Sequence, residues 1–143
     1  CMPSLSVLTV NALVAADSVI IPVQSQFLAA KGMTQLVKII SKVKRQINPS
    51  LKIDGVLLTL VDGRTNLSKS TKEAIVNDYG KYLKIFDTQI PMGIKAAETV
   101  ISGKSIFAYD KNSKVAKAYA DFTKEVLKLE RKEKNRLQSE QAR

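Results

Sequence analysis

The sequence has 143 residues, 45% of them hydrophobic, with one cysteine, no histidine and a formal net charge of +10. This length suits one domain with a substantial core, and the composition excludes disulfide frameworks, zinc sites and histidine-based catalytic triads. The 23 Lys and Arg against 13 Asp and Glu indicate a polyanionic partner, either nucleic acid or an anionic membrane surface. A lysine-rich, solvated surface without such a partner is the simpler alternative.

No run of about 18 apolar residues occurs, so no membrane-spanning helix is predicted. The first 30 residues lack the basic start and the cleavage site of a signal peptide, so a cytoplasmic setting is expected. Cys1 stands ahead of Met2. The chain is therefore expected either to be cut from a longer protein or to begin at Met2 with one extra residue.

The first half is predicted to alternate helices and buried strands. The expected elements are a helix over residues 5–16 with Ser4 as a possible cap, a strand over 19–23, a connecting segment over 24–30, a helix over 33–47 and a strand over 56–61. The last strand is an apolar run bounded by Gly55 and by the turn residues that begin at Asp62, which is typical of a strand buried on both faces. Ligands bind at the carboxyl ends of such strands, so Asp62, Arg64 and Asn66 are predicted to lie at a functional edge.

The second half is predicted to continue the alternation. The expected elements are a helix capped by Asn66 or Ser68 and running to Tyr79, a strand over 83–90, a loop over 92–95, a helix over 96–101, an extended linker over 105–109 and a last helix from Asp110. Residues 130–143 are nearly all polar, which favours a solvated helical end or a frayed tail beyond a domain of residues 1–129. The predicted fold class is α/β, a parallel sheet flanked by helices.

Several motifs resemble those of ParA/Soj-type partition ATPases, the deviant-Walker family that also contains MinD. The resembling stretches are MPSL at 2–5, LTVNAL at 8–13, ADSVIIPVQ at 16–24, GVLLT at 55–59, RTNL at 64–67, IP at 90–91, GK at 103–104 and YD at 109–110. They occur in the family's order over about residues 1–127. The resemblance implies a P-loop NTPase-like fold of which only the C-terminal half is present, without the phosphate-loop strand.

The resemblance also implies a function for the intact protein. Such proteins segregate plasmids or chromosomes, bind ATP and Mg²⁺, dimerise on ATP, bind DNA without sequence preference and respond to a ParB-like centromere-binding protein, which implies a nucleoid-associated location. Phosphoryl transfer requires a G-x-x-x-x-G-K-[ST] loop, whereas the six glycines of this chain are scattered singly. We therefore expect no cofactor binding, no catalytic residue and no ATP hydrolysis for this stretch on its own.

The DNA-binding candidates are four cations. Arg64 and Lys95 match DNA-linked arginines of the family, and Lys69 and Lys72 follow Arg64 on the next predicted helix. A guanidinium on an exposed loop can pair with two phosphate oxygens, but Arg64 could instead bond a nearby carbonyl or Asp62. The lysines could likewise form an ordinary solvated helix face.

The nucleotide-binding candidates are Thr59, Pro91, Met92 and Gly93, because Pro91 to Gly93 occupy the place where the family closes over the adenine. The family's Arg-Asn is replaced by Met92-Gly93 here, so contacts through the main chain are expected to survive and readout through side chains is not. Pro3 and Ser4 match the switch segment that senses the γ-phosphate in relatives, and a helix cap is the simpler role for Ser4.

Two alternative functions remain open from the sequence. One is a basic, non-enzymatic DNA-binding adaptor, and the other is a MinD-like positioning ATPase. The apolar face of the last predicted helix fades beyond Leu129, which disfavours the membrane-targeting helix that a MinD-like role requires.

Overall fold

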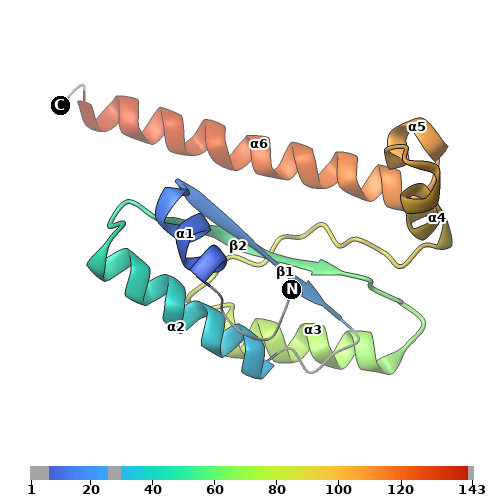
Figure 1. The fold of residues 1–143 in the computed structure, drawn as a ribbon, viewed down its shortest axis with the longest axis horizontal. Helices are drawn as coiled ribbons and strands as arrows, with labels where there is room; N and C mark the ends of the chain where they lie inside the picture. The colour runs from blue at the N-terminus through green and yellow to red at the C-terminus, as the bar shows by residue number, and fades with distance from the viewer. Residues whose placement is uncertain (1–6, 26–29, 142–143) are drawn as a thin grey trace.

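The computed structural model describes residues 7–25 and 30–141 (Figure 1). Its elements in chain order are α1 (Val7–Ala15), β1 (Ser18–Gln24), α2 (Ala30–Gln46), β2 (Lys52–Thr59), α3 (Asn66–Tyr79), α4 (Ile94–Ser102), α5 (Ile106–Asp110) and α6 (Lys114–Gln141). Within these described ranges, no helix has both the length and the apolar character that crossing a membrane requires.

The two strands form a parallel pair with α2 as the crossover, as the alternation in the sequence predicts. Ile21 pairs with Val56 and Val23 pairs with Leu58, and all four side chains are buried. Figure 1 shows α6 on one side of the strands and α2 and α3 on the other. The predicted fold class, a parallel sheet with helices on both faces, is confirmed.

Alternate residues of β2 supply two separate cores. Val56 and Leu58 pack with residues of α1, α2 and α3, such as Ile40 and Ile75. Leu57 faces the other side and packs with a second cluster that α6 and the segment before α4 complete. The strand is therefore buried on both faces, as its continuous apolar run predicts.

The strand predicted over residues 83–90 does not form as a continuous strand among the described residues. Ile85 of this segment bridges Val56 of β2, and Pro91, just after the segment, bridges Val61, two residues beyond the end of β2. Between them the Ile90 N–H donates to the Leu58 carbonyl at 2.9 Å. The irregular course still delivers Ile90 and Pro91 to the carboxyl end of β2.

Several further boundaries differ from the sequence predictions, among them the starts of α2 at Ala30, β2 at Lys52 and α4 at Ile94. Residues 105–109 are not an extended linker, because Ser105 caps a short helix, α5, by accepting a hydrogen bond from Ala108 N–H at 3.1 Å. The last helix begins at Lys114 rather than Asp110, since the Ser113 hydroxyl accepts from Ala116 N–H and starts the helix there. The strand predicted to reach Val61 ends at Thr59. Beyond Leu129, α6 continues as a helix to Gln141.

The Glu125 carboxylate of α6 binds the segment before α4. Glu125 accepts backbone N–H bonds from Asp87 and Thr88, each at 3.0 Å, and lies 3.5 Å from Lys84 Nζ. Burial acts to raise the pKa of Glu125, but the two N–H groups, the Thr88 hydroxyl and Lys84 outweigh it and hold the pKa below its usual value. The ionised form of Glu125 is therefore the one that holds this segment in place.

Replacing Glu125 with Gln is expected to lower the free energy of unfolding by about 2 kcal/mol at pH 7, because an amide cannot accept both N–H bonds. A carboxyl group whose pKa is depressed by folding contributes stability above its unfolded pKa and loses it as the pH falls through the folded value. The difference between wild type and variant should thus shrink as the pH falls below the unfolded value of 4.5. Urea unfolding from pH 7 to pH 3 measures this, with the exposed Glu140→Gln as control. A difference that stays constant with pH would contradict the assignment.

Candidate functional site

The carboxyl ends of the two strands lie at one edge with the segment that carries Ile90 and Pro91. Ser25 N–H donates to the Thr59 carbonyl at 3.0 Å, and Val61 N–H donates to the Ile90 carbonyl at 3.0 Å. Between them Leu60 has φ of 52°, a left-handed conformation that costs a non-glycine residue on the order of 1 kcal/mol. This residue ends β2 and redirects the chain toward Asp62.

Two buried serines hold the loop that follows. The Ser25 hydroxyl donates to the Leu60 carbonyl at 3.0 Å and lies 3.1 Å from the Ser68 hydroxyl. Ser68 Oγ in turn accepts from Asp62 N–H at 3.3 Å. Both serines are almost fully buried, so the start of α3 and the end of β2 are fixed by a satisfied internal network.

The cap of α3 is Thr65, not Asn66 or Ser68 as the sequence suggested. The Thr65 side chain accepts from Ser68 N–H at 3.3 Å, and its backbone is extended. Threonine is a preferred N-cap residue because its hydroxyl can accept from such an N–H in the first turn of a helix.

Arg64 projects from this loop and pairs with Asp62. Its Nε and Nη2 donate to the two carboxylate oxygens at 3.1 and 3.2 Å, while 90% of the Arg64 side chain stays exposed. The pair lowers the pKa of Asp62 through the side-chain and backbone hydrogen bonds from Arg64, and raises the pKa of Arg64. Asp62 therefore orients the guanidinium, and this pairing is the alternative to a phosphate contact that the sequence left open for Arg64.

The four nucleotide-binding candidates converge. Thr59, Pro91, Met92 and Gly93 all line one hollow of about 650 Å³, which Tyr119 of α6 also lines. Thr59 lies 32 residues before Pro91 in the chain, and the Val61–Pro91 bridge and the Ile90–Leu58 hydrogen bond bring the two residues together. Gly93 lies so close to α6 that a Cβ added there would stand 2.5 Å from Val115 Cγ2.

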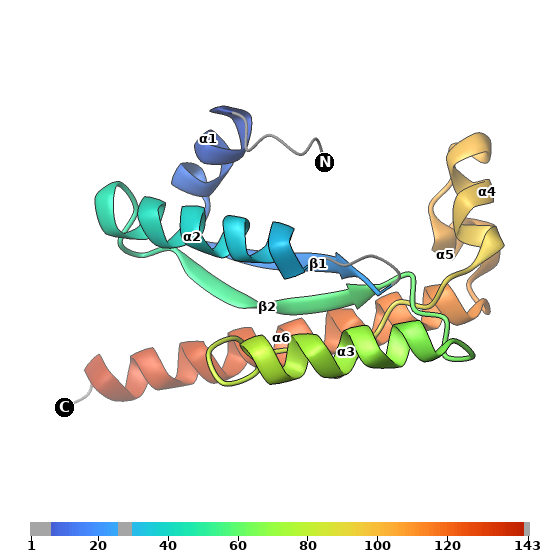
Figure 2. The same cartoon turned by 90° about the horizontal axis from the view of Figure 1, so that it is seen from below.

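A second hollow, of about 950 Å³, joins this edge to the Arg64 loop. Asp62, Arg64, Met92 and Gly93 line one side of it, and Lys114 of α6 lines another. Figure 2 shows α4 and α5 together at this end of the molecule. The candidate nucleotide and DNA residues therefore occupy neighbouring parts of one edge.

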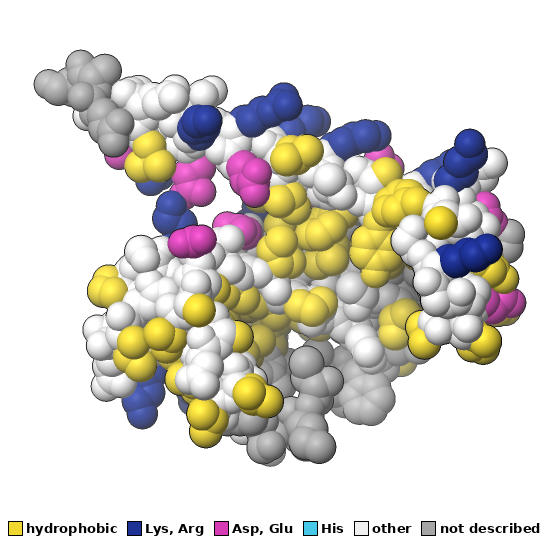
Figure 3. Space-filling model, turned by 45° about the horizontal axis from the view of Figure 1, so that its top comes forward, with side chains coloured by type: hydrophobic (Ala, Val, Ile, Leu, Met, Phe, Trp, Pro, Cys, Tyr) yellow, Lys and Arg dark blue, Asp and Glu magenta, His cyan; other side chains and the backbone are white. Residues whose placement is uncertain are grey.

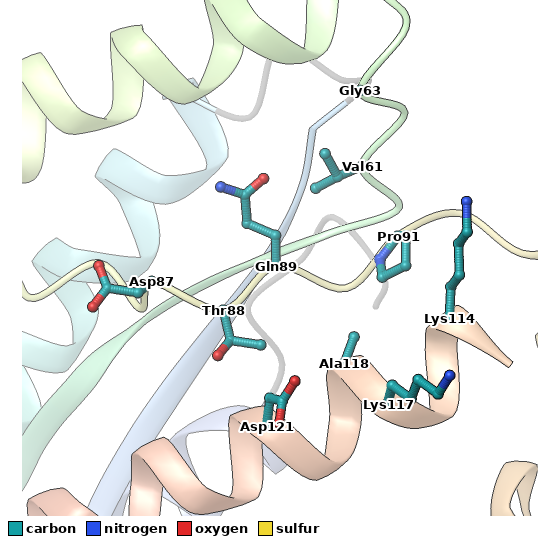
Figure 4. A pocket seen from close by; sticks show the side chains of 10 residues that line it. All are labelled: Val61, Gly63, Asp87, Thr88, Gln89, Pro91, Lys114, Lys117, Ala118 and Asp121. Atoms are coloured by element: carbon teal, nitrogen blue, oxygen red, sulfur yellow. The ribbon is translucent and has the colours of Figure 1, made fainter. Parts of the chain in front are cut away.

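A third hollow, of about 620 Å³, lies between the same edge and α6 (Figure 4). Val61, Gly63 and Pro91 line it from the sheet side, and Lys114 and Lys117 line it from α6. These two lysines were not among the predicted site residues. Their sequence signal is the Lys-x-x-Lys spacing at the start of the last helix, which only the packing of α6 places beside Gly63.

The structure says less about the remaining candidate residues. Lys69 and Lys72 are exposed on α3. Lys95 lies in α4, but its side chain is outside the described part of the structure, and so are Pro3 and Ser4. Over residues 7–25 and 30–141, no three Asp, Glu, Cys or His side chains come together as a metal site.

Comparison with known proteins tests the resemblance drawn from the motifs. A family model described as an AAA domain matches residues 1–53. The chain is 42% identical over 128 residues to the sporulation initiation inhibitor protein Soj of Bacillus subtilis, a match that covers 88% of this chain and 49% of Soj. It is 40% identical over 131 residues to the chromosome partitioning protein ParA of Caulobacter vibrioides, covering 92% of this chain and 48% of ParA. The chain is a homologue of Soj and ParA.

Solved structures are similar to the chain over most of its length. Cobyrinic acid a,c-diamide synthase from Mycobacterium smegmatis with a bound ATP analogue and magnesium matches with a TM-score of 0.70 and 37% identity, over 89% of this chain and 45% of the synthase. The same enzyme with ADP and magnesium matches with a TM-score of 0.68. The Soj/ParA homologue spans about half the length of the curated relatives it matches.

Proposed function

We propose that this Soj/ParA homologue serves in a partition ATPase for plasmids or chromosomes, in which it supplies a non-specific DNA-binding surface, part of the adenine pocket and part of the dimer interface. The observation that carries this proposal is the convergence of Thr59, Pro91, Met92 and Gly93 on one hollow beside the exposed Arg64. A ParB-like centromere-binding protein is the expected partner, and the nucleoid is the expected location.

The hollow suits a purine base. Its volume of about 650 Å³ and its lining of Leu60, Met92, Ile94 and Tyr119 offer apolar contact. The main chain at Pro91–Gly93 also lines it, although Met92 N–H already donates to the Val61 carbonyl and the Gly93 carbonyl accepts from Ala96 N–H. Met92 and Tyr119 are 49% and 40% exposed, so both can pack against an entering ring. Bound ATP and Mg²⁺ would supply the phosphoryl group and its charge neutralisation, and this stretch would contribute the base-side contacts and exclude water from them.

Arg64 suits a DNA phosphate. Its guanidinium stays charged, is almost fully exposed and is held by Asp62 with part of its donors still free for a second anion. Lys69 and Lys72 extend the positive charge along α3. Contacts of this kind position a protein on the DNA backbone without reading its sequence.

The proposal is tested by titrating a short duplex DNA over a salt series with wild type and Arg64→Ala. Removing one phosphate contact is expected to weaken binding about three- to tenfold and to reduce the slope of log K against log salt by about 0.9. Arg64 supports no core residue, so the variant should keep the wild-type unfolding curve. Arg45→Ala on α2 removes the same charge from an exposed helix and serves as the matched control. Equal effects of the two substitutions would show that Arg64 makes no specific phosphate contact.

A further inference from the structure

The outer face of α6 carries a stripe of positive charge that the sequence did not single out. At 100° per residue, six exposed cations point within about 60° of one direction. They are Lys114, Lys117, Lys124, Lys128, Arg131 and Lys132. Asp121 is the one acidic residue of this helix that shares the direction. The space-filling view shows a row of Lys and Arg side chains along α6 (Figure 3).

The packing of α6 fixes where this stripe points. Val115, Phe122, Val126 and Leu129 face the opposite way and pack into the second core, so α6 cannot roll without exposing them. Two acidic residues of the same helix are turned toward the body of the protein. Glu125 binds the amides of the segment before α4, and Glu133 pairs with Lys52. These two anions bind the fold, while Asp121, Glu130 and Glu140 stay exposed, and only Asp121 of these three points along the stripe.

The stripe is continuous with the Arg64 loop. Its first residue, Lys114, lines the hollow that Arg64 also lines, and Lys117 lines the hollow that Gly63 reaches. From Lys114 to Lys132 the helix rises about 27 Å at 1.5 Å per residue. A mixed, solvated helix face would scatter both signs of charge, whereas here Lys124–Asp121, at 2.9 Å, is the one ion pair that the described residues show within the stripe.

We propose that the outer face of α6 is a second phosphate-contact surface for duplex DNA, which extends the path of the DNA from Arg64 along the helix. This inference rests on the proposed DNA-binding function and adds to it a surface that the family motifs do not mark. Flexible lysines over about 27 Å meet many phosphates of a duplex, which carries one charge per about 1.7 Å of its axis. The contact would be independent of sequence and strongly dependent on salt.

The test compares two quadruple variants of equal charge. One replaces Lys117, Lys124, Lys128 and Arg131 with Gln. The control replaces Lys38, Lys42, Lys44 and Arg45, which are exposed on α2 across the sheet, with Gln. Each set removes three lysines and one arginine, which lowers the net charge from +10 to +6. Exposed substitutions of this kind usually change stability by less than about 0.5 kcal/mol, and thermal unfolding checks that both variants fold.

The α6 variant is expected to bind duplex DNA about 10- to 100-fold more weakly at 100 mM salt, with a salt slope shallower by about 2 to 4 units, while the α2 variant stays within threefold of wild type. Equal losses in both variants, or no loss in the α6 variant, would overturn the inference. Binding of the wild type to anionic phosphatidylglycerol vesicles in preference to DNA, lost in the α6 variant alone, would also overturn it in favour of a membrane surface.

Arg64→Ala in the same titration separates this inference from the proposed function. A loss with Arg64→Ala and none with the α6 variant would leave the Arg64 surface intact and remove the α6 surface. A loss with the α6 variant and none with Arg64→Ala would support the α6 surface and remove Arg64 from the DNA contact.

Discussion

Replacing Gly55 with Ala is expected to lower the free energy of unfolding by about 3 kcal/mol, because the substitution combines backbone strain with a clash. Gly55 has φ of 156°, which side chains rarely adopt. A Cβ there would stand 2.8 Å from the Phe86 ring and 2.9 Å from the Lys84 carbonyl. The segment that carries Pro91 to Gly93 would have to move away from β2, so the site should be perturbed together with the stability.

Urea unfolding of Gly55→Ala measures this loss, and Gly32→Ala is the matched control. Gly32 lies within α2 with no atom within 4 Å of an added Cβ. Alanine should therefore be tolerated there or stabilise the helix by about 0.5–1 kcal/mol. A Gly55→Ala variant as stable as wild type would mean that the segment before α4 does not pack against β2 as described.

Phe86→Ala is expected to cost about 4 kcal/mol, since it would empty a fully packed site. Phe86 is 2% exposed, and its ring meets that of Phe122 edge to face, with centroids 4.9 Å apart and planes at 85°. This contact joins the segment before α4 to α6, so its loss should loosen the helix that carries the cationic stripe.

The aromatic contact can be isolated with a double-mutant cycle. Comparing Phe86→Ala, Phe122→Ala and the double variant should give a coupling energy of about 1 kcal/mol. Phe107→Ala on α5 is the control, because that ring is half exposed and should cost far less. A coupling energy near zero would contradict the packing of α6 on this segment.

The regular elements could be predicted from the sequence where local pattern and packing agree. β1, α2, β2 and α3 follow from short apolar runs and helical spacing. The segment over 83–90 could not, because its sequence resembles a strand, whereas its pairing in the fold is limited to isolated bridges, Val56 with Ile85 and Val61 with Pro91. The short helix α5 was missed because its one local signal is the cap at Ser105.

The residues of the site that could be predicted from the sequence are those that match family motifs. Arg64, Thr59 and Pro91 were nominated by resemblance, and the fold brings Thr59 and Pro91 to one hollow. Ser25 and Ser68 were missed as the support of the loop, because a buried serine pair from distant segments leaves no pattern in the sequence. Lys114 and Lys117 were missed because their role depends on how α6 packs across the sheet edge.

The most direct test of the DNA-binding edge is an amide NMR titration of the ¹⁵N-labelled chain with a short duplex DNA. Shift changes are expected to concentrate at the Arg64 loop, including Gly63 and Arg64, and at the start of α3 and along α6. Amides of α2, which lies across the sheet from α6, should stay nearly unchanged. Changes centred on α2, with the Arg64 loop unaffected, would contradict the account.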